Sequence, residues 1–562
     1  MKIPKLTKLT VSFVAAYLSG VDPLFADCTQ GDLSTLPFDP ARLSEHVRIL
    51  ASDEFAGRAP ASAGETKTIE YLSKQFAALG LQPAGAAGGW TQEVPLRKFE
   101  LARAPKVSLK ENGVISELKY DDEVAGSSIA GEPHIDIKNA PIVFVGYGVT
   151  APEVGWDDFK GIDLKGKTAI ILMNDPDFES PAPGKFGGRA MTFYGRSVYK
   201  YSEAARRGAL AAFIVHEDAS ATVGWTTIKN SWDVTQFDID RAAPRQSHPL
   251  IEGWLRRDVA SRLLKKAGLD LDDLKQRAMQ ASFAPVELRG AQLSLRADIE
   301  ITPVLSHNVI GRLAGTSSPG QSVIYGAHWD QMGTGTPDST GDRVYHGAID
   351  NASGVAGLLE LARVFATNPP TARSLYFVAF TGEEIGLLGS EYYALHPPAP
   401  LEQTAAVFNM DIFLPHGPAC DVAIRGRPNN TLHEALTAVV KKQGRSLSPD
   451  AHLEAGYFYR SDHFPFAKLG VPAVSIMSGQ NLYQGGVAAG EKAYQEYMTH
   501  RYHQQSDRWS SDLDLRGEAL DLDVLYKAGR DIANSDAWPQ WFAASEFKRI
   551  RDQTARARER KK

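Results

Sequence analysis

The chain has 562 residues, too many for one compact hydrophobic core, so the sequence predicts two or three domains. Hydrophobic residues make up 43% and charged residues 23% of the chain, which excludes a mainly disordered protein and a mainly membrane-spanning one. The formal net charge of −6 offers no basic surface of the kind that nucleic acid requires, and we expect no nucleic-acid partner.

The first 26 residues have the layout of a secretory signal. Three lysines precede an apolar run over residues 9–18, and Ala26 is a small residue at the expected cleavage point. The run is too short to span a bilayer comfortably, and no other segment reaches the roughly 18 apolar residues that a membrane helix needs. We therefore expect export to the periplasm or the extracellular space. Pairing of the two cysteines, Cys28 and Cys420, stays open, as does the oligomeric state.

Residues 41–81 carry apolar side chains at helical spacing, with a break between Gly57 and Gly64, which predicts two helices. Between about 140 and 290, apolar runs at 168–172 and 211–215 predict strands separated by long polar loops, with a helix over 199–208. We interpret this region as a β-rich module inserted into the main domain.

From about residue 300 onward, apolar strands alternate with helices, which predicts an α/β domain with a mixed, mainly parallel central sheet flanked by helices. A helix is expected at 353–366, capped by Asn351 or Ser353, and the basic segment 547–562 is expected to be a solvated helix or disordered. The predicted strands cover 322–327, 374–380, 405–410 and 473–477. The predicted parts of the chain are a signal peptide (1–26), the N-terminal part of the main domain (27–138), the inserted module (139–292), the main α/β domain (293–540) and a basic tail (541–562).

Acidic and histidine side chains follow three of these predicted strands. His328 and Asp330 follow the first, the adjacent pair Glu383 and Glu384 follows the second, and Asp411 follows the third. Because open α/β sheets bind ligands at the carboxyl ends of their strands, these residues are expected to converge on one crevice.

Asp350 stands directly before the predicted helix at 353–366 and adds a further carboxylate. Imidazole and carboxylate groups together suit zinc or a similar divalent ion, and one carboxylate can bridge two such ions. Glu383 and Glu384 point in different directions in extended chain, so one of them would bind metal and the other would handle the proton of a water molecule.

The arrangement resembles the zinc aminopeptidase and glutamate carboxypeptidase family (metallopeptidase family 28). The segments that carry the resemblance are 327–330, 347–354, 380–384, 409–411, 461–466 and 502–503. The resemblance implies a zinc-aminopeptidase fold and a cofactor of two Zn²⁺ ions held by five side chains: Asp350 as the bridge, Glu384 and His503 on one ion, and His328 and Asp411 on the other. It also implies that Glu383 is the general base.

Some of these assignments rest on the resemblance alone. From the residues themselves, His500 and His463 are equal rivals of His503. The resemblance further implies that Asp330 orients the imidazole of His328, that Asp507 does the same for His503, and that the Asp350–Asn351 peptide bond is cis. Tyr457 or Tyr459 would either polarise the substrate carbonyl or pack in a loop.

The inserted module resembles a protease-associated domain, through the segments 155–159, 164–167 and 204–215. Such domains carry no catalytic groups of their own, and the resemblance implies that this one covers the active site or gates the substrate.

The predicted activity is that of an exported aminopeptidase, which hydrolyses the N-terminal bond of a peptide or small protein with a free N-terminus. The alternative is a carboxypeptidase or dipeptidase with the same metal centre, in which Arg425, Arg427 or Arg460 would bind a free carboxylate unless these arginines lie at the surface. A non-catalytic receptor and a one-zinc glutamine cyclase are disfavoured, because all the ligands for two ions and the base are present.

Overall fold

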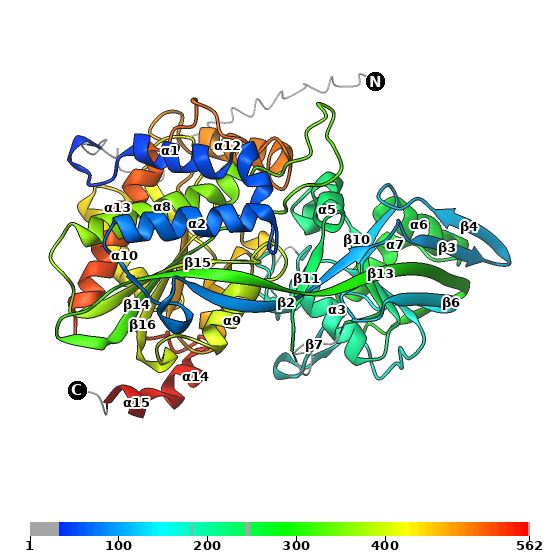
Figure 1. Cartoon of the computed structure of the whole chain (residues 1–562). Helices are drawn as coiled ribbons and strands as arrows, with labels where there is room; N and C mark the ends of the chain where they lie inside the picture. The colour runs from blue at the N-terminus through cyan, green and yellow to red at the C-terminus, as the bar shows by residue number, and fades with distance from the viewer. Residues whose placement is uncertain (1–32, 181–183, 242–247, 560–562) are drawn as a thin grey trace, which may run out of the picture.

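The computed structural model describes residues 33–180, 184–241 and 248–559. It forms two lobes that lie side by side and share one long strand (Figure 1). The predicted signal peptide and Cys28 lie outside the described residues. Within the described part of the chain, no helix combines the length and apolar character that crossing a membrane would require.

The larger lobe is built on a sheet whose centre is parallel. β14 (Ser318–His328) lies between β15 (Arg373–Phe380) and β16 (Thr404–Met410), and β19 (Ala473–Ser478) follows β16, all in parallel register. β13 (Val286–Leu313) and β17 (Asp421–Ile424) flank this centre and run antiparallel to it. This confirms the predicted mixed, mainly parallel sheet.

Helices cover both faces of this sheet. Successive side chains of a strand point to opposite faces of the sheet, so the hydrophobic core has one cluster on each face. Tyr325 packs in the cluster on one face and Ile324 in the cluster on the other. The helices on the Tyr325 face are α1 (Pro40–Leu50), α2 (Ala63–Ala78), α8 (Gly354–Ala366), α10 (Leu432–Lys442) and α13 (Arg516–Asn534), several of which are visible in Figure 1. The helices on the opposite face are α9 (Leu388–Leu395) and α11 (His463–Lys468).

The smaller lobe has its own sheet and its own hydrophobic core. Its strands are β3 (Lys106–Glu111), β4 (Val114–Leu118), β5 (Val124–Ser127), β6 (His134–Phe144), β9 (Thr168–Leu172), β10 (Ala211–His216) and β12 (Ile251–Arg256). Three helices, α5 (Trp225–Trp232), α6 (Arg257–Lys266) and α7 (Leu271–Ala278), pack in this lobe, and α3 (Ser197–Arg206) contacts β10.

The two sheets are joined through β13. Its first part pairs with β3 and β6 of the smaller lobe, and its second part pairs with β2 (Thr91–Leu101) and β15 of the larger lobe. The expected module boundaries at 139 and 292 therefore fall inside β6 and β13. The sheet of the smaller lobe already begins at β3, before the expected boundary at 139. Because β13 runs from one sheet into the other, no loop in the sequence marks the junction.

The basic C-terminal segment corrects one expectation. It forms α14 (Lys548–Gln553) and α15 (Ala555–Glu559), in which Arg551 is 1% and Arg558 is 6% exposed. Both guanidinium groups lie near the ring of Trp538, and Arg551 donates a hydrogen bond to the carbonyl of Thr404. A solvated tail was wrong for these residues, because a guanidinium group can lie against an aromatic ring and donate to a backbone carbonyl while it is buried.

Candidate metal centre

The parallel strands deliver the predicted side chains to one edge of the larger sheet. His328 is the last residue of β14, Asp411 directly follows β16, and Glu383 and Glu384 lie in the loop after β15. Because β14, β15 and β16 run parallel, their carboxyl ends meet at this edge.

Two further side chains reach the same edge from helix ends. Asp350 lies in the turn Ala348–Ser353 that leads into α8, and His503 follows α12 (Gly486–His500) by three residues. The structure thus brings all six predicted residues together.

The distances form two groups that share Asp350. Nε2 of His328 lies 3.3 Å from Oδ1 of Asp350 and 3.4 Å from Oδ1 of Asp411. Nε2 of His503 lies 3.5 Å from Oδ2 of Asp350 and 2.9 Å from Oε2 of Glu384. In each group the possible ligand atoms lie within 4.8 Å of one another, and Asp350 presents a different oxygen to each group.

The donor atoms of these groups suit a cation. Nε2 of His328, Nε2 of His503 and Oε1 of Glu384 are buried and make no hydrogen bond in the structure. Buried polar atoms of folded proteins are almost always hydrogen-bonded or bound to metal, so three such atoms aimed at one place indicate a ligand there. Imidazole nitrogen and carboxylate oxygen are ligands that zinc accepts.

The electrostatics point the same way. Burial raises the pKa of Glu383 well above its ordinary value. Burial alone would lower the pKa of His503, but Glu384 and Asp350 raise it to about 9. His328 behaves likewise, since burial opposes protonation while Glu383 and the neighbouring aspartates raise its pKa well above the usual range. The centre therefore carries an excess of negative charge that favours positive charge inside it.

Asp330 contacts both His328 and the Glu383 loop. Nδ1 of His328 lies 3.2 Å from the backbone oxygen of Asp330 and 3.7 Å from its Oδ1. The carboxylate of Asp330 accepts hydrogen bonds from the backbone N–H groups of Glu383 and Glu384, at 3.1 and 3.4 Å. This residue thereby ties the end of β14 to the loop after β15.

Asp507 has a different position from the one expected. Its carboxylate accepts hydrogen bonds from the backbone N–H groups of Ile349 and Asp350, whereas the ring nitrogen of His503 that faces away from the centre contacts Ser231. Asp507 therefore fixes the backbone that carries Asp350.

Asn351 connects three segments of the centre. The Asp350–Asn351 peptide bond is cis, as expected. The side-chain oxygen of Asn351 accepts from the N–H of Gly354 at the start of α8, and its amide donates to the carbonyl of Met410 at the end of β16. The same oxygen accepts from the N–H of Ile412.

Arg58 is a buried residue for which the sequence predicted no role. It is 1% exposed and donates hydrogen bonds to the backbone carbonyls of Trp329, His346, Gly347 and Leu50. The first three carbonyls belong to the segments that carry His328 and Asp350, so one guanidinium holds both segments in place.

Asp411 is held by two neighbours. The hydroxyl of Ser461 donates to its Oδ2 at 2.6 Å, and the guanidinium of Arg425 donates to its backbone oxygen at 2.6 Å. Arg425 is 3% exposed, so it is not a surface arginine, and its contacts with Asp411 engage it inside the protein.

The rival histidines belong to neither group of possible ligands. His463 is fully buried and packs edge-on against Phe458, and neither of its ring nitrogens makes a hydrogen bond in the structure. Burial lowers the pKa of His463 to about 3. His500 is an exposed residue at the end of α12.

A cavity of about 350 Å³ opens onto the centre. Asp350, Glu383, Glu384, Asp411 and His503 line it, together with residues from both lobes. The wall residues from the smaller lobe include Arg196, Tyr201, Ile228, Ser231, Trp232 and Trp254. A ligand at the centre would therefore lie between the lobes.

Tyr457 and Tyr459 both line this cavity. The hydroxyl of Tyr457 is hydrogen-bonded to that of Tyr494 at 2.6 Å, while the ring of Tyr459 packs against Phe193 and Phe464. These contacts account for both side chains as parts of the wall.

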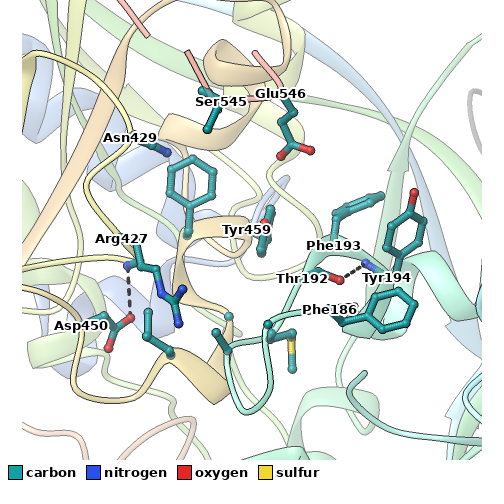
Figure 2. A pocket seen from close by; sticks show the side chains of 18 of the residues that line it. Phe186, Thr192, Phe193, Tyr194, Arg427, Asn429, Asp450, Tyr459, Ser545 and Glu546 are labelled. Carbon is teal, nitrogen blue, oxygen red and sulfur yellow. Dashed lines mark hydrogen bonds between the residues drawn. The ribbon is translucent and has the colours of Figure 1, made fainter. Parts of the chain in front are cut away.

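A second cavity of about 510 Å³ lies on the other side of this wall. Figure 2 shows Arg427 and Asp450 on one side of it and Phe193 on the opposite side. Phe193, Tyr457 and Tyr459 line both cavities and so separate them. Arg427 therefore faces the second cavity and not the metal centre.

Comparison with known proteins places these residues in one family. Residues 308–521 match the sequence profile of peptidase family M28. These residues form an M28 peptidase domain. A probable zinc metalloprotease of Pyrenophora teres f. teres is 40% identical over 112 residues, which cover 20% of this chain and 23% of that relative. Aminopeptidase YwaD of Bacillus subtilis is 30% identical over 223 residues, 38% of this chain and 43% of that relative. The chain thus spans less than half the length of either relative.

An aminopeptidase from Aneurinibacillus sp. strain AM-1 shares the fold of the M28 domain and much of the remaining chain. Its solved structure matches with a TM-score of 0.52 at 21% identity and covers 88% of this chain and 94% of that one. The M28 domain contains all six predicted residues of the centre, whereas most of the smaller lobe lies outside it.

Proposed function

We propose that this protein is an exported aminopeptidase with two zinc ions, one in each group of ligands. The observation that carries the proposal is the sharing of Asp350 between two sets of buried ligand atoms, several of which make no hydrogen bond. His328 and Asp411 would hold one ion, and Glu384 and His503 the other. When bound, two such ions would polarise the peptide carbonyl and lower the pKa of a bound water molecule to about 7.

Glu383 is the general base of this proposal. Its carboxylate lies beside the ligand groups, 4.0 Å from Nε2 of His328, and faces the cavity without belonging to either group. It would take a proton from the attacking water and deliver it to the leaving amine of the peptide. Asp330 keeps it in place through the hydrogen bond from the Glu383 N–H.

The substrate of this proposal is a peptide or small protein with a free N-terminus. A cavity of about 350 Å³ suits a short peptide segment and not a folded surface. The smaller lobe would act as a protease-associated domain that closes over the peptide, as its contribution to the walls supports.

One observation favours a carboxypeptidase or dipeptidase as the second candidate. Arg196, from the smaller lobe, lines the cavity, and its Nε is buried without a hydrogen bond. Burial, together with the nearby Arg460, lowers the pKa of Arg196 to about 9. An arginine of this kind can bind a free carboxylate in a bidentate way.

A panel of aminoacyl chromogenic substrates, assayed with and without a chelator, tests the proposal. We expect chelator-sensitive activity, and a Glu383→Gln variant that retains zinc but loses activity by about 10²–10⁴-fold. Normal turnover by Glu383→Gln would remove this residue from the mechanism. Peptides with a blocked N-terminus and peptides with an amidated C-terminus separate the two candidates, because an aminopeptidase rejects the former and a carboxypeptidase the latter.

A further inference from the structure

Helix α5 (Trp225–Trp232) of the smaller lobe reaches the metal centre of the larger one, and Figure 1 shows it at the junction of the lobes. Two consecutive residues make the contact. The amide of Asn230 donates a hydrogen bond to the backbone oxygen of His503 at 3.0 Å. The hydroxyl oxygen of Ser231 lies 3.1 Å from Nδ1 of the same histidine. The lobe outside the M28 domain therefore touches both the backbone and the ring of one predicted ligand.

The direction of the second hydrogen bond follows from the partners of Ser231. Its hydroxyl donates to the carbonyl of Thr227 at 2.9 Å, one turn earlier in α5. A hydroxyl has only one hydrogen, so towards His503 its oxygen can only accept. Nδ1 of His503 must then carry the proton. When the ring gives up its other proton, as metal binding requires, the nitrogen that is freed is therefore Nε2, which faces Asp350 and Glu384.

The backbone of His503 needs support of its own. Its φ angle is +55°, in the left-handed region that side chains other than glycine rarely adopt. The hydrogen bond from Asn230 to its carbonyl holds this conformation, and the ring of Tyr502 stacks on the imidazole at 3.9 Å. Strained backbone of this kind persists only where neighbours hold it.

The other histidine of the centre does not depend on the smaller lobe. Nδ1 of His328 faces the backbone oxygen of Asp330, which lies two residues away in the same M28 domain. In the described part of the chain, the hydrogen bond shown for Nδ1 of His503 is the one with Ser231. The partner of Nδ1 thus comes from the smaller lobe for His503 and from the M28 domain for His328.

We propose that Ser231 and Asn230 are positioning residues for His503, so that docking of α5 completes one of the two metal positions. This inference rests on the proposed zinc centre. The position formed by Asp350, Glu384 and His503 would bind its ion tightly only with the smaller lobe in place. The position formed by His328, Asp350 and Asp411 would bind independently of it.

The test is the zinc affinity of each position in the full-length protein, measured by competition with a chelator and by elemental analysis. We expect wild-type protein to bind two zinc ions. Ser231→Ala should weaken one of them by about 10–100-fold and leave the other unchanged. Ser231→Thr keeps a hydroxyl that can bond both partners and should retain wild-type affinity. Asn230→Ala tests the backbone contact separately and should weaken the same ion.

Thr226→Ala provides the matched control, because this residue is exposed on the same helix and should alter neither affinity. The inference is overturned if Ser231→Ala and Asn230→Ala bind both ions like wild type. It is also overturned if these two variants lose both ions equally, because that would show a general loss of structure. Thermal unfolding of each variant checks whether the fold is intact. A wild-type protein that binds no zinc would instead refute the proposed function itself.

Discussion

The backbone N–H of Asp350 donates a hydrogen bond to Oδ2 of Asp507 at 3.0 Å, and the neighbouring N–H of Ile349 donates to the same carboxylate. Asp507 is 1% exposed, so both donors depend on it and not on water. One buried carboxylate thereby fixes the backbone on which both ligand groups depend.

Replacing Asp507 with alanine should damage the centre without removing a ligand. Two buried N–H groups would lose their acceptor, and each such loss costs about 1–3 kcal/mol. We expect a lower melting temperature, weaker binding of both zinc ions and a lower kcat. Asp507→Asn keeps one acceptor oxygen and should recover part of the loss. Thermal unfolding and zinc titration of the two variants check this, and equal behaviour of Asn and Ala would contradict it.

Replacing Arg58 should destabilise the protein even when the new residue is lysine. Its guanidinium donates to four backbone carbonyls in different directions, which a single ammonium group cannot reach. We expect both Arg58→Lys and Arg58→Ala to lower the free energy of unfolding by about 3 kcal/mol or more, since buried acceptors lose their donors. Urea unfolding measures the effect. The exposed Arg48 on α1 is a suitable control, and its replacement by lysine should change little.

Apart from Asp350, which precedes a predicted helix, the residues of the centre that could be predicted from the sequence alone are acidic or histidine residues at the ends of predicted strands. His328, Glu383, Glu384 and Asp411 follow apolar strands, and parallel strands gather their carboxyl ends by geometry alone. His503 has no such signal, because it follows a helix and its chain neighbours include another histidine. Only the family resemblance selected it.

The supporting residues could not be predicted for a different reason. Arg58 acts on backbone carbonyls, which every residue possesses, so its partners leave no pattern in the sequence. Ser231 and Asn230 lie more than 270 positions before His503, in the other lobe, and no periodicity connects segments so far apart. The boundaries of the smaller lobe were hidden because β13 passes from one sheet to the other without a break.

Removing single ligands should separate the two metal positions. His503→Ala takes away a ligand of one group only, and we expect this variant to keep one zinc ion per chain. Asp350→Ala removes the carboxylate that both groups share and should leave neither ion tightly bound. Elemental analysis after dialysis against zinc buffer measures the difference. Equal zinc content in the two variants would contradict a bridging role for Asp350.

A buried carboxyl that belongs to neither group of possible metal ligands should make stability depend on pH. Glu518, on α13, is 1% exposed, and neither of its carboxyl oxygens makes a hydrogen bond in the structure. Burial, then the nearby Asp521 and Glu360, raises its pKa well above the ordinary value. A group whose pKa is raised in the folded state contributes stability that is fully present below the unfolded pKa, about 4.3, and is lost as pH rises towards the folded pKa.

Glu518→Gln should therefore stabilise the protein at high pH and not at low pH. Glutamine has nearly the same shape and never ionises, so the free energy of unfolding of the variant should exceed that of wild type at pH 8. The difference should shrink towards zero as pH falls to about 4.3. Urea unfolding at several pH values measures it. Glu434→Gln, on the exposed side of α10, is the matched control and should leave the pH dependence unchanged. A Glu518→Gln variant that follows the wild-type pH curve would show that this carboxyl stays ionised inside the core.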